Sequence, residues 1–94
     1  MNQPQKQKTP KQLERHFKEI ANHRRLEILF LINSNSGLTL EEISRRLSVN
    51  FKTISGHTDK LVRAGLLDKK YRGREVEHYL SPYGLKLVRL VKTF

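Results

Sequence analysis

Residues 38–67 read LTLEEISRRLSVNFKTISGHTDKLVRAGLL and predict two helices separated by a tight turn. Thr39, followed three residues later by Glu42, forms a capping box in which each side chain satisfies a backbone N–H at a helix start. We therefore expect a helix over 40–47, and a second helix over 50–64 that is capped by Asn50. Gly65 follows at the position where a left-handed residue commonly ends a helix.

The helix predicted over 50–64 has a buried side and an exposed side. At about 100° per residue, Phe51, Thr58 and Leu61 fall on the same side as Ile54, and we expect this side to be buried. The opposite side carries Lys52, Gly56, Asp59 and Arg63. An interior glycine costs about 1 kcal/mol of helix stability relative to alanine. Gly56 either lets the helix backbone approach a partner closely, or it is a neutral surface residue that packing elsewhere tolerates.

Two helices are expected before this region. The first begins near Pro10 and has an apolar stripe made of Leu13, Phe17, Ile20 and Ala21. The second is capped by Asn22 and turns apolar side chains inward. These inward side chains are Leu26, Leu29 and Phe30, with Ile28 and Ile32 beside them.

A hairpin and a last helix are expected after it. Two extended runs on either side of a turn at Arg72-Gly73 predict a hairpin over 67–80, with Val76, His78 and Leu80 on one face. A short strand near Leu38 is expected to accompany it. Ser81-Pro82 is typical of a helix start and predicts a helix over 82–93.

The composition fits one small domain. Ninety-four residues suffice for one modest core, and the absence of cysteine excludes disulfides, thiolate metal sites and cysteine nucleophiles. The longest apolar run, 28–32, is far too short to span a membrane, and the polar start shows no secretory signal. We expect a disordered basic arm over residues 1–10, a domain over 11–94, and a cytoplasmic location.

Positive charge is concentrated between residues 50 and 74. The net charge is +10, and these 25 residues contain seven Lys or Arg and two acidic residues, a surplus of +5. Such a basic surface either is a solvated face or binds a polyanion, most directly a nucleic acid.

Two short helices followed by a basic hairpin form a helix-turn-helix with a wing. Residues 21–32, residues 38–67 and the hairpin ending in LSPYG resemble the winged helix-turn-helix repressors of the ArsR type. The nearest match consists of Ser55, His57, Leu61, Ala64, Gly65 and Leu66. The Leu-Ser-x-x-Gly of residues 80–84 is more similar to the MarR type, and Thr58 stands where the ArsR type usually has leucine.

The resemblance covers roughly residues 13–94 and implies a mostly α fold with a small β-hairpin wing (α+β). It also implies a sequence-specific transcriptional regulator that binds double-stranded DNA as a repressor, associates with the nucleoid when bound, and requires no cofactor.

General rules of DNA recognition suggest roles for individual residues of this fold. A helix fits the major groove and reads base edges with side chains near its N-terminal end, where free N–H groups also favour a phosphate. In this resemblance, a wing over 67–80 reaches the flanking minor groove or the backbone. The residues expected to contact DNA are Asn50, Lys52, Thr53, Ser55, Gly56, His57, Lys60, Lys70, Arg72 and Arg74. His57 could instead hydrogen-bond within the helix-turn-helix, and the basic hairpin could serve solubility alone.

The last helix is apolar around more of its circumference than one small domain can cover. We therefore expect a two-fold symmetric homodimer, with recognition helices about one DNA turn, roughly 34 Å, apart on an inverted-repeat operator. The alternative is a loosely packed monomer wrapped by the extra apolar residues. The residues expected at the dimer interface are Leu87, Leu90, Val91, Phe94, Leu13 and Phe17.

The four histidines do not predict a metal site. Thiolate sites of the ArsR type need cysteine, and residues 82–94 contain no His, Asp or Glu for a site in the last helix. No Ser/His/Asp set and no phosphate-binding glycine loop is evident, so we expect no enzymatic activity. A protein-interaction adaptor and an RNA-binding winged helix remain as alternatives. The clustered charge argues against the adaptor but does not exclude RNA.

Overall fold

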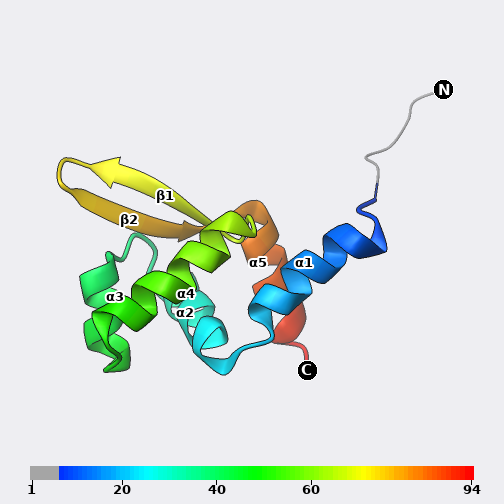
Figure 1. Cartoon of the computed structure of the whole chain (residues 1–94), viewed down its shortest axis with the longest axis horizontal. Coiled ribbons are helices and arrows are strands. Elements are labelled where there is room, and N and C mark those ends of the chain that lie inside the picture. Colours follow the sequence, from blue (N-terminus) through cyan, green and yellow to red (C-terminus); the bar gives the residue numbers. More distant parts are fainter. Residues whose placement is uncertain (1–6) are drawn as a thin grey trace.

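The computed structural model describes residues 7–94, which form five helices and one two-stranded antiparallel sheet (Figure 1). The elements are α1 (Pro10–Ile20), α2 (His23–Ser34), α3 (Leu40–Leu47), α4 (Phe51–Arg63), β1 (Leu67–Arg72), β2 (Glu75–Leu80) and α5 (Pro82–Val91). The predicted mostly α fold with a β-hairpin is confirmed. The arm predicted over 1–10 falls largely on residues 1–6, outside the described residues, and Thr9 with Gln12 forms a capping box at the start of α1.

Side-chain caps start the helices where the sequence predicts them. The Asn22 side chain accepts hydrogen bonds from the backbone N–H groups of the second and third residues of α2, and Asn50 does the same for α4. The predicted capping box of Thr39 and Glu42 is present at the start of α3. Gly65, which follows the C-cap residue Ala64 of α4, has a φ of +78°, as expected of a left-handed residue at a helix end.

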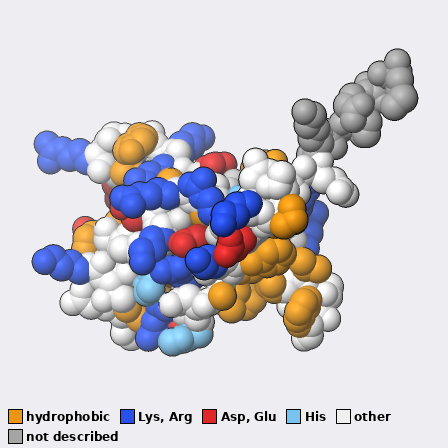
Figure 2. Space-filling view, turned by 45° about the vertical axis from the view of Figure 1, so that its right-hand side comes forward, with side chains coloured by type: hydrophobic (Ala, Val, Ile, Leu, Met, Phe, Trp, Pro, Cys, Tyr) orange, Lys and Arg blue, Asp and Glu red, His pale blue; other side chains and the backbone are white. Residues whose placement is uncertain are grey.

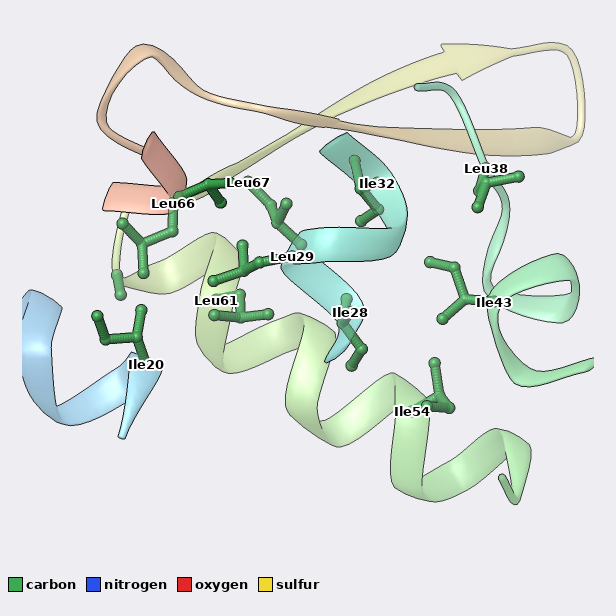
Figure 3. Packing of buried hydrophobic residues seen from close by; sticks show 12 residues of the cluster. Ile20, Ile28, Leu29, Ile32, Leu38, Ile43, Ile54, Leu61, Leu66 and Leu67 are labelled. Atoms are coloured by element: carbon green, nitrogen blue, oxygen red, sulfur yellow. The ribbon is translucent and has the colours of Figure 1, made fainter. Parts of the chain in front are cut away.

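The core is built around α2, which contacts every other helix and β2. Figure 3 shows its Ile28, Leu29 and Ile32, each at most 1% exposed, between Ile20 of α1 on one side and Ile43 of α3 on the other. The other buried members of the core are Leu38, Ile54, Leu61, Ala64, Leu66, Leu67 and Val88.

Two aromatic residues predicted to be buried are not. Phe51 is 48% exposed, because it is the first residue of α4 and lines an open hollow of about 220 Å³ beside Leu40 and Val76. Phe30 on α2 is 37% exposed, and the Lys92 ammonium lies 6.0 Å from the centroid of its ring. Thr58 is buried as predicted, and its Oγ1 has no hydrogen-bond partner within residues 7–94.

The hairpin turn lies one residue later than predicted. Arg72 pairs with Glu75 across the ladder, so the two turn residues are Gly73 and Arg74. Gly73 has a φ of +61°, and a positive φ at the first turn position suits glycine. The short strand expected near Leu38 is present as a bridge to His78, whose Nδ1 lies 2.9 Å from the Leu38 carbonyl oxygen.

Ser81 joins the end of α4, the start of β1 and the start of α5. Its Oγ donates to the carbonyl oxygen of Gly65 at 2.6 Å, its N–H donates to the carbonyl oxygen of Leu66 at 3.1 Å, and its Oγ accepts from the N–H of Gly84. Gly84 packs so closely that a Cβ there would overlap the carbonyl oxygen of Leu66. The Leu-Ser-x-x-Gly motif therefore forms this junction. The helix that follows ends at Val91, two residues before the predicted end.

No helix within residues 7–94 is both long enough and apolar enough to cross a membrane.

Candidate nucleic-acid interface

The outward side of α4 is polar and open. Lys52, Thr53 and Lys60 are exposed, and Ser55 is half-buried. A Cβ placed on Gly56 would have no heavy atom of its surroundings within 4 Å. Any partner approaching this side therefore meets a flat stretch of backbone at Gly56, next to lysine side chains.

The N-terminus of α4 is less open to an anion than we predicted. The Oδ1 of Asn50 accepts from the backbone N–H of Lys52 at 2.8 Å and of Thr53 at 3.4 Å. These two N–H groups, which we expected to be free for a phosphate, are occupied by the cap. The side chain of Asn50 is thus already used as a helix cap, although the residue is exposed.

The wing carries a row of exposed cations. Lys70, Arg72 and Arg74 are all exposed around the turn. Arg72 is partly neutralised, because its Nε lies 3.5 Å from Oε2 of Glu77, a carboxylate that also accepts from the hydroxyl of Tyr79. Lys70 and Arg74 have no ion-pair partner within residues 7–94. The two unpaired cations are therefore freer than Arg72 to meet a phosphate.

A residue that the sequence did not single out, Arg25, lies behind α4. It is 9% exposed, and its Nε donates to Nδ1 of His57 at 3.2 Å. Its Nη1 donates to the Glu19 carboxylate at 3.1 Å. The intramolecular hydrogen bond predicted as an alternative for His57 is therefore present. Burial, and then the Arg25 guanidinium, lower the pKa of His57.

The opposite end of the molecule is apolar. In Figure 2, hydrophobic side chains gather on the right, where Figure 1 places α1 and α5, and most visible Lys and Arg side chains lie to their left. Leu13, Phe17 and Leu90 are 40–46% exposed and Phe94 is 97% exposed, whereas Leu87 and Val91 are half-buried. Leu13, Phe17 and Leu87 line a common hollow of about 170 Å³. We call the side chains of Leu13, Phe17, Leu87, Leu90, Val91 and Phe94 the apolar end.

In the part of the chain that the structure describes, no three His, Asp or Glu side chains come together as a group that could hold a metal ion.

Comparisons with known proteins agree with this geometry. The model of the MarR family matches residues 21–72, more than half of the chain. A search among curated proteins finds no match. Among solved structures, HlyU from Vibrio cholerae is 30% identical, with a TM-score of 0.80 over 92% of this chain and 94% of that one.

Two further structures extend the comparison. A winged helix-turn-helix domain from Mycobacterium bovis, described as homodimeric and as a possible ArsR-family regulator, is 27% identical, with a TM-score of 0.80 over 88% of this chain and 77% of that one. MepR, a transcription regulator of a Staphylococcus aureus multidrug efflux pump, is 20% identical, with a TM-score of 0.74 over 87% of this chain and 65% of that one, and it shares the fold. The chain belongs to the MarR family of winged-helix, DNA-binding transcription regulators.

Proposed function

We propose that the protein binds double-stranded DNA as a homodimer, reads a specific sequence with α4 and represses transcription there. The observation that carries this proposal is the outward side of α4, where Lys52, Thr53 and Lys60 are exposed around Gly56. A glycine with open space in front of it allows close approach to the floor of the major groove. Side chains near the start of the helix would then face the base edges.

The wing supports the same docking. With α4 in the major groove, Lys70, Arg72 and Arg74 would neutralise phosphates flanking it or enter the neighbouring minor groove. The residues proposed to contact DNA are Asn50, Lys52, Thr53, Ser55, Gly56, His57, Lys60, Lys70, Arg72 and Arg74. Within the proposed set, Arg74 and Lys70 contribute more than Arg72, because Glu77 already neutralises part of the Arg72 charge.

The apolar end supports the homodimer. Only Ile20 of α1 is buried, so a second copy would cover the Leu13 and Phe17 side chains together with those of α5. The similar domain from Mycobacterium bovis is described as homodimeric. A two-fold axis through this end would match an inverted-repeat operator. We assign the protein to the ArsR-like type and place it in the cytoplasm, on the nucleoid when bound, with no metal or cofactor.

Selection of bound fragments from genomic DNA by the purified protein tests this function. We expect a single inverted-repeat sequence among the fragments, and an affinity for it that falls steeply between low and moderate salt because phosphate neutralisation dominates binding. Duplex RNA and unrelated proteins serve as the control ligands. Enrichment of no sequence, or equal affinity for duplex RNA and duplex DNA, would contradict the proposal.

A further inference from the structure

Arg25 is the one buried side chain with a permanent charge among residues 7–94. A buried charge is costly unless it is paired and its donors are satisfied. Its Nη1 donates both to the carboxylate of Glu19, at 3.1 Å, and to the backbone carbonyl of the same residue, at 3.3 Å. Its Nε is left to donate to His57. Arg25, on α2, thus links the end of α1 to the middle of α4.

This contact decides which nitrogen of His57 carries the proton. A guanidinium has donors only, so Nδ1 of His57 must accept with its lone pair and the ring proton must sit on Nε2. The ring is half-buried. Its Nε2 has no hydrogen-bond partner within residues 7–94, and this atom is not fully buried. The outer edge of His57 is therefore an oriented N–H donor at the protein surface.

The surroundings of that donor carry more basic than acidic groups. Besides Arg25, the groups that act electrostatically on His57 are Lys60 of α4 and Arg24 and His23 at the start of α2. Arg25 and Arg24 are paired with the carboxylates of Glu19 and Glu27, at 3.1 and 2.8 Å, whereas Lys60 has no ion-pair partner within residues 7–94. Lys60 and Thr53 lie three and four residues from His57, on the same strip of α4. The N-terminus of α2 adds the positive end of its helix dipole. An N–H donor at such a place fits an anion, and a phosphate is the anion that DNA presents beside a helix in its groove.

We infer that His57 donates from Nε2 to a phosphate of the bound DNA as a neutral imidazole, and that the buried Arg25 is the positioning residue that fixes its tautomer and orientation. The inference rests on the proposed function and extends it to a residue outside the contact surface. A second proton on Nδ1 would point at the Nε–H of Arg25, so the ring stays neutral. The phosphate contact is then a hydrogen bond that releases no counterion.

Two amide substitutions test the roles of the two ring nitrogens of His57 separately. In His57→Asn the amide oxygen takes the place of Nδ1 and still accepts from Arg25, but the outward donor is lost. In His57→Gln the amide nitrogen reaches the place of Nε2 and restores the donor. The probe is a short mixed-sequence DNA duplex, because a phosphate contact is independent of sequence.

We expect His57→Asn to bind about fivefold more weakly than the unmodified protein. His57→Gln should bind with an affinity between the two, because it keeps the outward donor but not the acceptor for Arg25. The salt slope of log affinity should be the same in both. Equal affinities of the two variants would overturn the inference. So would a slope smaller by about 0.9 in His57→Asn, since that is the loss expected of a cationic contact.

Arg25→Lys tests the positioning role. Lysine keeps a positive charge near Glu19 but lacks the Nε–H that holds Nδ1, so His57 can take a second proton. We expect DNA binding of this variant to strengthen as the pH falls below about 6.5, the ordinary pKa of histidine, because burial still lowers the pKa of His57. The double variant Arg25→Lys/His57→Gln should lose that dependence, which controls for His16 and His23.

If the DNA affinity of Arg25→Lys depended on pH in the same way as that of the unmodified protein, Arg25 would have no positioning role. If the unmodified protein binds no duplex at all, the proposed function itself fails. If it binds and the His57 variants do not differ, only the present inference fails.

Discussion

At the scale of single residues, two glycines inside helices meet opposite surroundings. Gly56 faces open space, whereas a Cβ on Gly84 would overlap the backbone of Leu66. We expect Gly56→Ala to raise the free energy of unfolding by about 1 kcal/mol. Gly84→Ala should lower it by about 1–3 kcal/mol or more, because the overlap is with backbone. Denaturant titration of the two variants measures both effects.

The same pair of variants decides between the two interpretations of Gly56. If its missing side chain allows close approach to DNA, Gly56→Ala should bind the selected operator more weakly while being more stable. A more stable variant with unchanged affinity would make Gly56 a neutral surface residue.

His78 makes stability depend on pH. Its ring is 1% exposed, and burial lowers its pKa despite the bond to the Leu38 carbonyl oxygen. In the unfolded chain the ring is protonated below about pH 6.5, while in the folded chain it stays neutral to a lower pH. The unfolded state therefore binds more protons in this range, and stability falls as the pH falls below about 6.5.

Thermal unfolding followed from neutral to mildly acid pH checks this. We expect the melting temperature of the unmodified protein to drop by several degrees. His78→Asn keeps an N–H donor toward Leu38 but cannot titrate, so its melting temperature should drop less. An identical drop in the two proteins would show that His78 does not cause the dependence. Burial also lowers the pKa of His16 and His57, which accounts for any remaining loss.

At the scale of elements, α4 and the wing should contribute differently to DNA binding. Replacing Lys52 and Thr53 by alanine should reduce affinity for the selected operator more than for random DNA, because these side chains lie at the groove-entering end of α4. Arg74→Ala should weaken both about equally and lower the salt slope by about 0.9. Arg72→Ala is the matched control and should lower the slope less, since Glu77 already neutralises it. Equal loss for both DNAs in the Lys52/Thr53 variant would contradict direct readout by this end of the helix.

The order and starts of the elements could be predicted because their signals are local. Asn22, Thr39, Asn50 and Ser81 each act on N–H groups two or three residues away, so the capping residue and its target appear together in the sequence. The predicted hairpin turn was one residue too early because two short strands can pair in several registers. Only the pairing of Arg72 with Glu75 decides between them.

The burial of individual side chains was less predictable. Phe51 has the helical position of a core residue, but as the first residue of α4 it lines the open hollow beside Leu40 and Val76, and its side chain stays exposed. The contact between Arg25 and His57 joins residues 32 apart on two helices. The periodicity of a single helix cannot reveal a contact between two helices. The one signal that could have indicated it is that Arg25 lies three, four and seven residues before Ile28, Leu29 and Ile32, and therefore on the buried side of α2.

At the scale of the whole molecule, one end is basic and the other apolar, which predicts the quaternary structure. Replacing Leu90 of α5 and Phe94, the two most exposed side chains of the apolar end, by glutamate should give a folded monomer. Each chain would then hold one half-site alone, and operator binding should weaken by at least about tenfold. Sedimentation and operator titration measure the two effects.

Tyr71→Glu is the control for this prediction. Tyr71 is 70% exposed on the wing and is not part of the apolar end, so its replacement should leave the state of association unchanged. An unmodified protein that sediments as a monomer at high micromolar concentration would contradict the dimer.

The junction at Ser81 has a consequence for the half-site spacing that such a dimer recognises. Its bonds to Gly65 and Leu66 hold the end of α4 against the first turn of α5, and Gly84 leaves no room between that turn and the backbone of Leu66. The angle between the reading helix and the pairing helix is thus set inside each subunit, by a few buried atoms. Substitutions on the outer side of α5 can then change how tightly two subunits pair without changing the separation of their two reading helices. Subunit affinity and preferred half-site spacing can therefore evolve independently of each other.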